Sequence, residues 1–186
     1  WKGLRMRIAI IGSGYVGLVS GACLADFGHE VTCIDSNAEK IEALKAGIMP
    51  IYEPGLDQLV ATNVKAKRLV FTTEMEGPVS RAEAVFIAVG TPSRRGDGHA
   101  DLSYVYGVAR EIARSIRQFT VVITKSTVPV GTGDEVERLI REESPDADVA
   151  VVSNPEFLRE GAAIEDFKRP DRIVIGIEDE RARAVM

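Results

Sequence analysis

An α/β fold with a doubly wound parallel sheet is predicted by three observations. Short apolar runs alternate along the chain with helical patterns, which is typical of parallel strands buried on both faces. A glycine-rich turn, Gly12-Ser-Gly-Tyr-Val-Gly17, directly follows the first run. Asp35 follows the second run, close to the spacing of about twenty residues at which a carboxylate meets a ribose. The sequence therefore predicts a dinucleotide-binding domain over residues 1–186.

The predicted strands are apolar runs that end at glycine, proline or polar residues. They cover residues 7–11, 30–34, 69–72, 84–89, 120–124 and 149–152, and a seventh is expected at 173–177. Because strands alternate with helices, the sheet should be parallel, and ligands should bind beyond the carboxyl ends of its strands.

Helices are predicted where apolar residues recur at helical spacing and capping residues mark the ends. They cover residues 15–27, 36–46, 56–63, 78–82, 102–116 and 132–143. Gly28 and Gly47 suit the position after the first two helices. Capping boxes are expected to open helices at Ser36 and Thr132, and Asp101 is expected to cap the long helix that follows it. Another helix should begin at Pro155, and a charged helical pattern begins at 178.

Each glycine of the turn has a separate predicted role. Gly12 permits the tight turn, Gly14 lets backbone N–H groups approach a pyrophosphate, and Gly17 lets the helix pack close to the sheet. The start of the helix then presents unpaired N–H groups to the phosphates. A carboxylate at Asp35 accepts from ribose hydroxyls and repels a 2′-phosphate, so a Rossmann-like domain that binds NAD is expected. The alternative is a glycine-rich turn without a ligand, which the surrounding strand, helix and acid disfavour.

Composition and charge exclude several classes of function. The net charge of −5, without a long basic run, argues against nucleic acid as the main partner. No apolar stretch approaches the roughly 20 residues of a membrane helix, no signal peptide is evident, and residues 1–5 resemble a short extension before Met6. Cys23 and Cys33 lie in apolar segments and are interpreted as buried hydrophobes. We expect a cytoplasmic protein without a metal site or a membrane partner.

Polar residues and glycines follow most of the predicted strands, where the edge of a parallel sheet binds ligands. They are Gly12-Ser-Gly14, Asp35, Gly90-Thr-Pro92, Lys125-Ser-Thr-Val-Pro129 and Asn154-Pro-Glu156. Glu156 and Glu160 are four residues apart and would share one face of a helix. Beside Thr127, this pair is a candidate for activating water or moving protons, whereas a solvated surface pair is the plain alternative. These residues alone predict an NAD-dependent redox domain and name no substrate.

Longer motifs occur in a fixed order along the chain. They are Gly12-Ser-Gly-Tyr-Val-Gly17, Ile51-Tyr-Glu-Pro-Gly-Leu56, Gly90-Thr-Pro92, Lys125-Ser-Thr-Val-Pro-Val-Gly131, Asn154-Pro-Glu-Phe-Leu-Arg-Glu-Gly161 and Asp166-Phe-Lys-Arg-Pro-Asp-Arg172. Together they resemble the UDP-glucose/GDP-mannose dehydrogenase family over essentially the whole chain. The ending Arg169-Pro-Asp-Arg-Ile-Val-Ile-Gly176 is more similar to the UDP-glucose branch.

The resemblance implies an enzyme that oxidises the C6 alcohol of UDP-glucose to UDP-glucuronate with two NAD, through an aldehyde and a cysteine thioester. It implies catalytic roles for Thr127, Glu156 and Glu160, with Glu156 activating or positioning the water that Thr127 holds. The expected NAD contacts are Gly12, Ser13, Gly14, Tyr15, Val16, Gly17, Asp35, Lys40, Val89, Gly90, Thr91, Pro92, Ser126, Thr127 and Glu160. The expected substrate contacts are Glu156, Phe157, Leu158, Arg159 and Glu160. As alternatives, Lys40 is a solvated lysine, and Phe157 and Leu158 are core residues.

The family's nucleophilic cysteine, its lysine, asparagine and aspartate partners, its dimerising central helix and its uridine-binding domain all lie beyond this length. The resemblance therefore implies that residues 1–186 are the NAD-binding portion, which binds NAD but does not oxidise UDP-glucose alone. A homo-oligomer is expected for the full-length enzyme, a monomer for this portion, and polysaccharide biosynthesis as its pathway. The alternatives are a dehydrogenase of GDP-mannose or a UDP-N-acetyl sugar, and a non-catalytic NAD-binding module.

Overall fold

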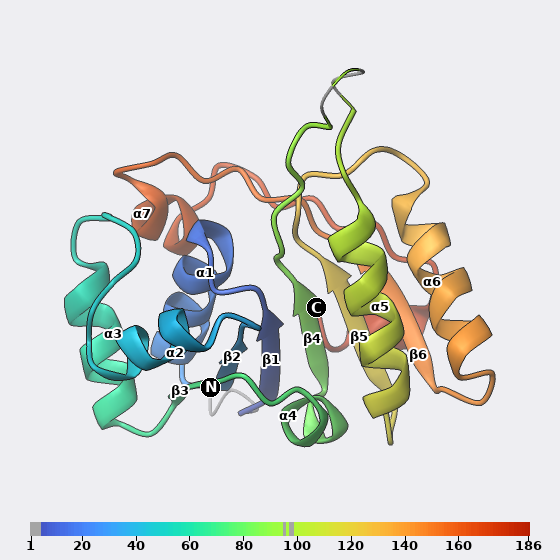
Figure 1. Cartoon of the computed structure of the whole chain (residues 1–186), viewed down its shortest axis with the longest axis horizontal. Helices are drawn as coiled ribbons and strands as arrows, with labels where there is room; N and C mark the ends of the chain where they lie inside the picture. Colours follow the sequence, from blue (N-terminus) through green and yellow to red (C-terminus); the bar gives the residue numbers. More distant parts are fainter. Residues whose placement is uncertain (1–4, 95, 97–98) are drawn as a thin grey trace.

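A parallel sheet forms the centre of the computed structural model, which describes residues 5–94, 96 and 99–186. Within these residues, six strands lie in the order β3-β2-β1-β4-β5-β6 (Figure 1). They are β1 (Arg7–Ile11), β2 (Glu30–Ile34), β3 (Leu69–Thr72), β4 (Ala84–Ile87), β5 (Thr120–Thr124) and β6 (Val149–Ser153). The strand order reverses between β1 and β4, where doubly wound sheets bind their ligands. The predicted fold class is confirmed.

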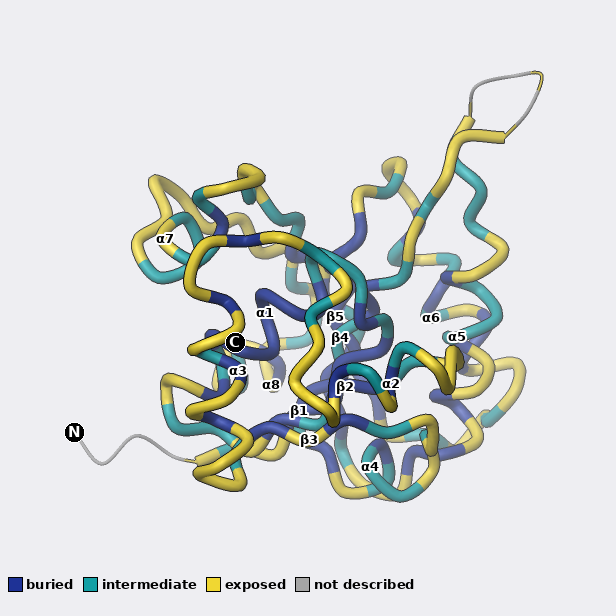
Figure 2. Tube along the Cα trace, turned by 60° about the vertical axis from the view of Figure 1, so that its left-hand side comes forward, coloured by how far each residue is buried: buried dark blue, intermediate teal, exposed yellow. Residues whose placement is uncertain are grey.

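Helices cover both faces of the sheet (Figure 1). They are α1 (Tyr15–Asp26), α2 (Ala38–Lys45), α3 (Leu56–Lys65), α4 (Glu76–Arg81), α5 (Ser103–Ser115), α6 (Thr132–Glu143), α7 (Ala163–Lys168) and α8 (Glu180–Arg183). Because successive strand residues point to opposite faces, Ile8 and Ile10 pack with α1 and α3, whereas Ala9 and Ile11 pack with α5 and α6. Figure 2 shows the buried residues gathered on the strands and the inner helix surfaces.

The predicted seventh strand at 173–177 is wrong. In the described chain this segment joins the sheet through one antiparallel bridge, between Ser153 and Gly176. The backbone pairing does not continue past Ser153, because the backbone N–H of Asn154 donates to Thr124 O and only its side-chain amide reaches the segment, at Val174 O. Ile173 is 67% exposed.

Both predicted capping boxes are wrong, although the helices themselves form. Asn37, not Ser36, caps α2, and its side chain accepts from Lys40 N at 3.0 Å. Thr132 instead donates its hydroxyl to Pro129 O at 2.7 Å, and Gly131 occupies the cap position of α6. Asp101 is not the cap residue of α5, because Leu102 holds that position without a side-chain cap. The Asp101 carboxylate still accepts from Ser103 N, in the first residue of the helix, at 3.0 Å.

One prediction falls largely outside the described residues. The short extension expected at residues 1–5 covers residues 1–4, which the structure does not describe. Cys23 and Cys33 are both buried and free, and burial raises the pKa of each thiol to about 12. None of the helices in the described ranges has both the length and the apolar character that crossing a membrane requires.

Substitutions of two helical glycines should have opposite effects on the free energy of unfolding, because one glycine is tightly packed and the other is not. A Cβ added at Gly21 would lie 2.5 Å from Cys33 Sγ and 3.3 Å from Ile10 Cδ1. Gly21→Ala should therefore lower the free energy of unfolding by about 1–3 kcal/mol. Gly107→Ala in α5 meets open space and should raise it by about 0.5–1 kcal/mol. Urea denaturation of both variants tests this, and equal shifts would contradict it.

Candidate dinucleotide-binding site

The turn between β1 and α1 has the shape that its glycines predict. Gly12 has a φ of +103°, and a Cβ added there would lie 2.5 Å from Ala88 O. A Cβ added at Gly17 would lie 1.8 Å from Gly12 O, so the helix touches the turn backbone to backbone. Gly14 has no atom within 4 Å of an added Cβ. The turn is thus closed on its inner side and open at Gly14.

The first turn of α1 offers free donors at this opening. Gly14 is the N-cap residue and provides no side-chain cap. Since the first N–H groups of a helix lack partners within the helix, they carry a partial positive charge that suits an anion. Ser13 lies buried at the turn, and within the described chain its hydroxyl oxygen has no hydrogen-bond partner. This geometry suits a pyrophosphate.

Asp35 lies directly after β2 and faces the turn. Its Oδ2 accepts from Ser13 N at 2.9 Å and from Lys40 Nζ at 2.8 Å, while Oδ1 accepts from Asn37 N at 3.0 Å. Burial raises the pKa of Asp35, but these hydrogen bonds outweigh burial and hold the pKa below its usual range. A carboxylate has about four lone pairs, so one remains on Oδ1 for a ribose hydroxyl. Lys40 is therefore held at Asp35 and is not simply solvated.

Two loops on the other side of the turn are tied together. Val89, Gly90, Thr91 and Pro92 follow β4, and Ser126 and Thr127 follow β5. The Ser126 hydroxyl donates to Val89 O at 2.7 Å, and the Thr91 hydroxyl donates to Thr127 O at 3.1 Å. These predicted cofactor residues therefore lie together at the carboxyl edge of the sheet. Thr127 itself is exposed.

The helix predicted to begin at Pro155 does not form there. Residues 154–159 have no regular secondary structure, a turn follows at 160–162, and α7 begins only at Ala163. Glu156 Oε2 accepts from Leu158 N at 2.5 Å, so the carboxylate closes a local turn in place of the first helical turn. Glu156 and Glu160 consequently share no helix face, and the expectation that spacing would align them is wrong.

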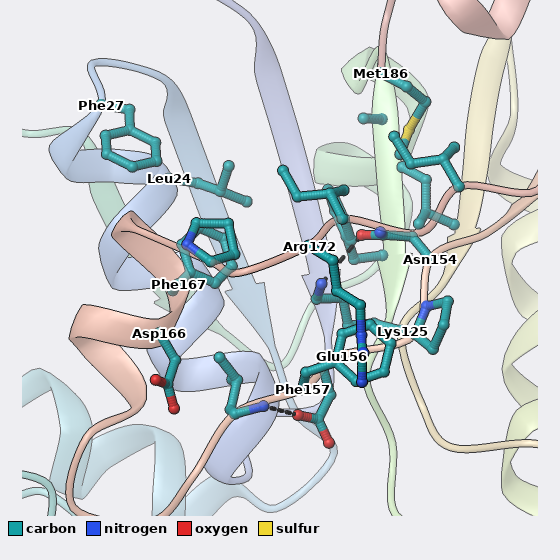
Figure 3. Close-up of a pocket in the computed structure, with 18 of the residues that line it drawn as sticks. Leu24, Phe27, Lys125, Asn154, Glu156, Phe157, Asp166, Phe167, Arg172 and Met186 are labelled. Atoms are coloured by element: carbon teal, nitrogen blue, oxygen red, sulfur yellow. Dashed lines mark hydrogen bonds between the residues drawn. The ribbon is translucent and has the colours of Figure 1, made fainter.

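The segment after β6 lines a groove of about 660 Å³ on the α1 face of the sheet (Figure 3). Its floor includes Ile8, Phe86 and Ile123, and residues 156–159 line one end. Lys125, which is buried, reaches Asn154 Oδ1 at 3.0 Å. Burial lowers the pKa of the Lys125 ammonium, which nearby Glu156 partly opposes. The glycine turn and Asp35 do not line this groove, so it is distinct from the candidate dinucleotide site.

The other predicted substrate residues have ordinary partners as well. Phe157 is exposed, and the Arg172 guanidinium lies over its ring, with Cζ 4.6 Å from the ring centroid. Leu158 packs against the core, as its alternative interpretation proposed. Arg159 forms an ion pair with Asp166 at 2.6 Å. Glu160 is exposed, in the turn before α7.

One buried carboxylate in this region was not predicted as a site residue. Glu53 accepts from the hydroxyl of Tyr15 and from the backbone of Gly161. The only signal in the sequence was its place in the Ile51–Leu56 motif, because its partners are far away in the chain.

Among the described residues, no group of three His, Cys, Asp or Glu side chains could hold a metal.

The comparisons with known proteins agree with this geometry. Residues 6–186 match the sequence profile of the UDP-glucose/GDP-mannose dehydrogenase family, NAD binding domain. A UDP-glucose 6-dehydrogenase of Rhizobium meliloti is 70% identical over 183 residues, 97% of this chain and 42% of that protein. A UDP-glucose 6-dehydrogenase of Pseudomonas aeruginosa is 48% identical over 181 residues, 95% of this chain and 40% of that protein.

Solved structures show the same relationship. A UDP-glucose dehydrogenase from Pyrobaculum islandicum matches with a TM-score of 0.94 and 45% identity, over 100% of this chain and 44% of that one. A GDP-mannose dehydrogenase from Pseudomonas aeruginosa matches with a TM-score of 0.93 and 41% identity, over 97% of this chain and 43% of that one. This chain thus spans less than half the length of these relatives. It belongs to the UDP-glucose/GDP-mannose dehydrogenase family, and residues 6–186 correspond to the family's NAD binding domain.

Proposed function

We propose that this chain is the NAD-binding part of a UDP-glucose 6-dehydrogenase, which oxidises UDP-glucose to UDP-glucuronate in two steps. One observation carries the proposal: the glycine turn, Asp35 and the tied loops after β4 and β5 meet at one edge of the sheet. The relative that is 70% identical has this name, which supports UDP-glucose as the sugar nucleotide.

In this proposal the chain's own residues bind and orient the dinucleotide. The N–H groups at the start of α1 hold the pyrophosphate, and Asp35 with Lys40 holds the adenosine ribose. The loops 89–92 and 126–127 hold the nicotinamide half, together with Glu160. The remaining contacts are assigned to Ser13, Tyr15, Val16 and the three glycines of the turn. NAD, when bound, supplies the acceptor for the hydride that leaves the substrate.

Glu156 and Thr127 are proposed to handle water and protons at the substrate, and Phe157, Leu158 and Arg159 to contact the sugar nucleotide. Support comes from their placement: Lys125 and Asn154 bond directly, which joins the loops that carry Thr127 and Glu156. Glu156 already uses one oxygen to accept from Leu158 N, and this bond fixes the direction of its carboxylate. Thr127 is exposed, which suits contact with a ligand.

The rest of the enzyme belongs to this proposal too. Residues 1–186 form the NAD-binding domain, and the thiol chemistry, the dimerising helix and the uridine site are assigned to other parts of the longer protein. A homo-oligomeric enzyme of polysaccharide biosynthesis is proposed, with this portion monomeric. A cytoplasmic location is supported by two buried cysteines that form no disulfide.

A dehydrogenase of another nucleotide sugar is the second candidate. The structural match to a GDP-mannose dehydrogenase, at 41% identity, supports it. Substrate competition assays on the full-length enzyme distinguish the two. A non-catalytic NAD-binding module is disfavoured because Thr127, Glu156 and Glu160 are all present.

Calorimetric titration tests the cofactor site. NADH should bind at micromolar to sub-millimolar Kd, about −8 to −5 kcal/mol, and NADPH at least about tenfold more weakly, since its 2′-phosphate meets Asp35. Asp35→Ala should weaken NADH about tenfold or more, as expected for a hydrogen bond to a charged group. Glu42→Ala removes an exposed carboxylate of α2 that pairs with Lys45, and should leave binding unchanged. Unchanged NADH binding by Asp35→Ala would contradict the proposed site.

The pH dependence of NADH binding follows from the lowered pKa of Asp35. The ionised carboxylate is the form that accepts from the ribose, and the bonds from Lys40, Asn37 and Ser13 keep it ionised below the usual value of about 3.9. The affinity should therefore stay level as pH falls to about 5 and decline only below about 4. Calorimetry across this range checks it, with Asp35→Asn expected to bind weakly at every pH. A decline that begins near neutral pH would contradict the assignment.

Enzyme activity gives a separate prediction. The purified chain, supplied with UDP-glucose and NAD, should give no steady rise in NADH absorbance, because the residues of the thioester chemistry are assigned elsewhere. The same preparation should bind NADH by calorimetry, which shows that the domain is folded. A steady rise in absorbance would mean that this chain holds a complete catalytic site.

A further inference from the structure

Glu53 is a charged residue in an unusual place. It lies in the loop between α2 and α3 and is only 5% exposed. Carboxylates are almost never buried to this extent unless strong partners compensate for the lost water. Within the described chain its partners are neutral hydrogen-bond donors, so the compensation comes from directed bonds. Such bonds fix the positions of the donors as well.

The donors come from two distant parts of the chain. Glu53 Oε2 accepts from Tyr15 Oη at 2.7 Å and from Gly161 N at 2.8 Å, and Oε1 accepts from Ala163 N at 2.8 Å. Burial raises the pKa of Glu53, but these bonds, with one from the Ile164 backbone, outweigh it and keep the pKa below its usual range. Glu53 is therefore ionised at neutral pH, and hydrogen bonds to an ionised acceptor are stronger than those between neutral groups.

Tyr15 connects this carboxylate to the dinucleotide turn. It is the first residue of α1 and follows Gly14 directly. Its hydroxyl oxygen also lies 3.1 Å from the carbonyl oxygen of Arg159. Both ends of the 159–161 segment therefore contact the Tyr15–Glu53 pair. Burial first, and then the bond to Glu53, raise the pKa of Tyr15, and the nearby charge of Glu160 adds to this effect. Glu160 lies between Arg159, whose carbonyl oxygen contacts the Tyr15 hydroxyl, and Gly161, which donates to Glu53, so it is held near the start of α1.

The segment that carries Glu160 has no regular structure of its own. Residues 154–159 lie in neither a helix nor a strand and 160–162 form a turn, so their conformation depends on bonds to other elements. Asp166 holds Arg159 from one side, and Glu53 holds Gly161 from the other. We propose that Glu53 is a positioning residue that sets Glu160 against the nicotinamide half of the dinucleotide by tying Gly161 to Tyr15. This inference rests on the proposed function, in which Glu160 contacts the cofactor.

Comparing two ligands, one with the nicotinamide half of the dinucleotide and one without it, distinguishes this positioning role from an effect on general stability. Asp35 after β2 marks the adenosine side, so the nicotinamide half extends across the strand reversal toward the loops after β4, β5 and β6. ADP-ribose lacks the nicotinamide and does not depend on Glu160. A loss confined to NADH is therefore the signature of a displaced Glu160, whereas general destabilisation affects both ligands alike.

The test compares three variants with the unaltered chain by calorimetry with NADH and with ADP-ribose. Glu53→Gln keeps the shape of the side chain but removes its charge and leaves one N–H of the loop facing an amide NH2. It should weaken NADH about tenfold and leave ADP-ribose nearly unchanged. Tyr15→Phe removes only the hydroxyl, keeps the bonds from Gly161 and Ala163, and should give a smaller loss with the same preference for NADH. It also provides the test if Glu53→Gln does not fold.

Lys168→Met is the matched control. It breaks the ion pair of α7 with Asp26, at 2.7 Å, and leaves the contacts of Glu53 in place. It should lower thermal stability without changing the ratio of the two affinities. If Glu53→Gln weakens both ligands equally, or has no more effect than Lys168→Met, the inference is overturned while the proposed function stands. If the unaltered chain binds neither ADP-ribose nor NADH, the proposed function fails, and the inference fails with it.

Discussion

Backbone contact between the start of α1 and the turn after β1 is the constraint on which the rest of the structure depends. A Cβ at Gly17 would lie 1.8 Å from the Gly12 carbonyl oxygen, so neither helix nor turn leaves room for a side chain. This contact aims the first turn of α1 at the carboxyl edge of the sheet. It also places Ser13 within reach of Asp35 and Tyr15 within reach of Glu53. A larger residue at Gly17 would separate α1 from the sheet and move both contacts together.

Two carboxylates flank this turn and work in the same way. Asp35 accepts from the backbone of Ser13 and Asn37, and Glu53 accepts from the backbone of Gly161 and Ala163. In both cases hydrogen bonds to the ionised form outweigh the cost of burial, so each group stays charged. Asp35 ties the turn to the residues that follow β2, and Glu53 ties the segment after β6 to Tyr15 at the start of α1.

The match to the family covers all residues of the candidate dinucleotide site. The match to the NAD binding domain covers residues 6–186, which include the turn, Asp35 and every loop of the carboxyl edge. Glu53 lies within one of the motifs that indicated the family, yet its spacing predicted no chemistry. Its role depends on partners 38, 108 and 110 residues away. This residue of the motif therefore joins distant segments of the chain.

Local patterns determined the six strands of the sheet, the helices between them and the placement of the glycine turn, Asp35 and the loops after β4 and β5. These follow from hydrophobic periodicity and from glycine geometry, which are properties of neighbouring residues. Tertiary contacts decided the rest. The helix expected at Pro155 begins instead at Ala163, because Glu156 closes a local turn and Glu53 supplies the acceptor for the N–H of Ala163. The strand expected at 173–177 is reduced to one bridge, because Asn154 turns its amide to Val174. The bonds of Glu53 to Ala163 and of Asn154 to Val174 join residues that are far apart in the sequence, so no spacing within either segment encodes them.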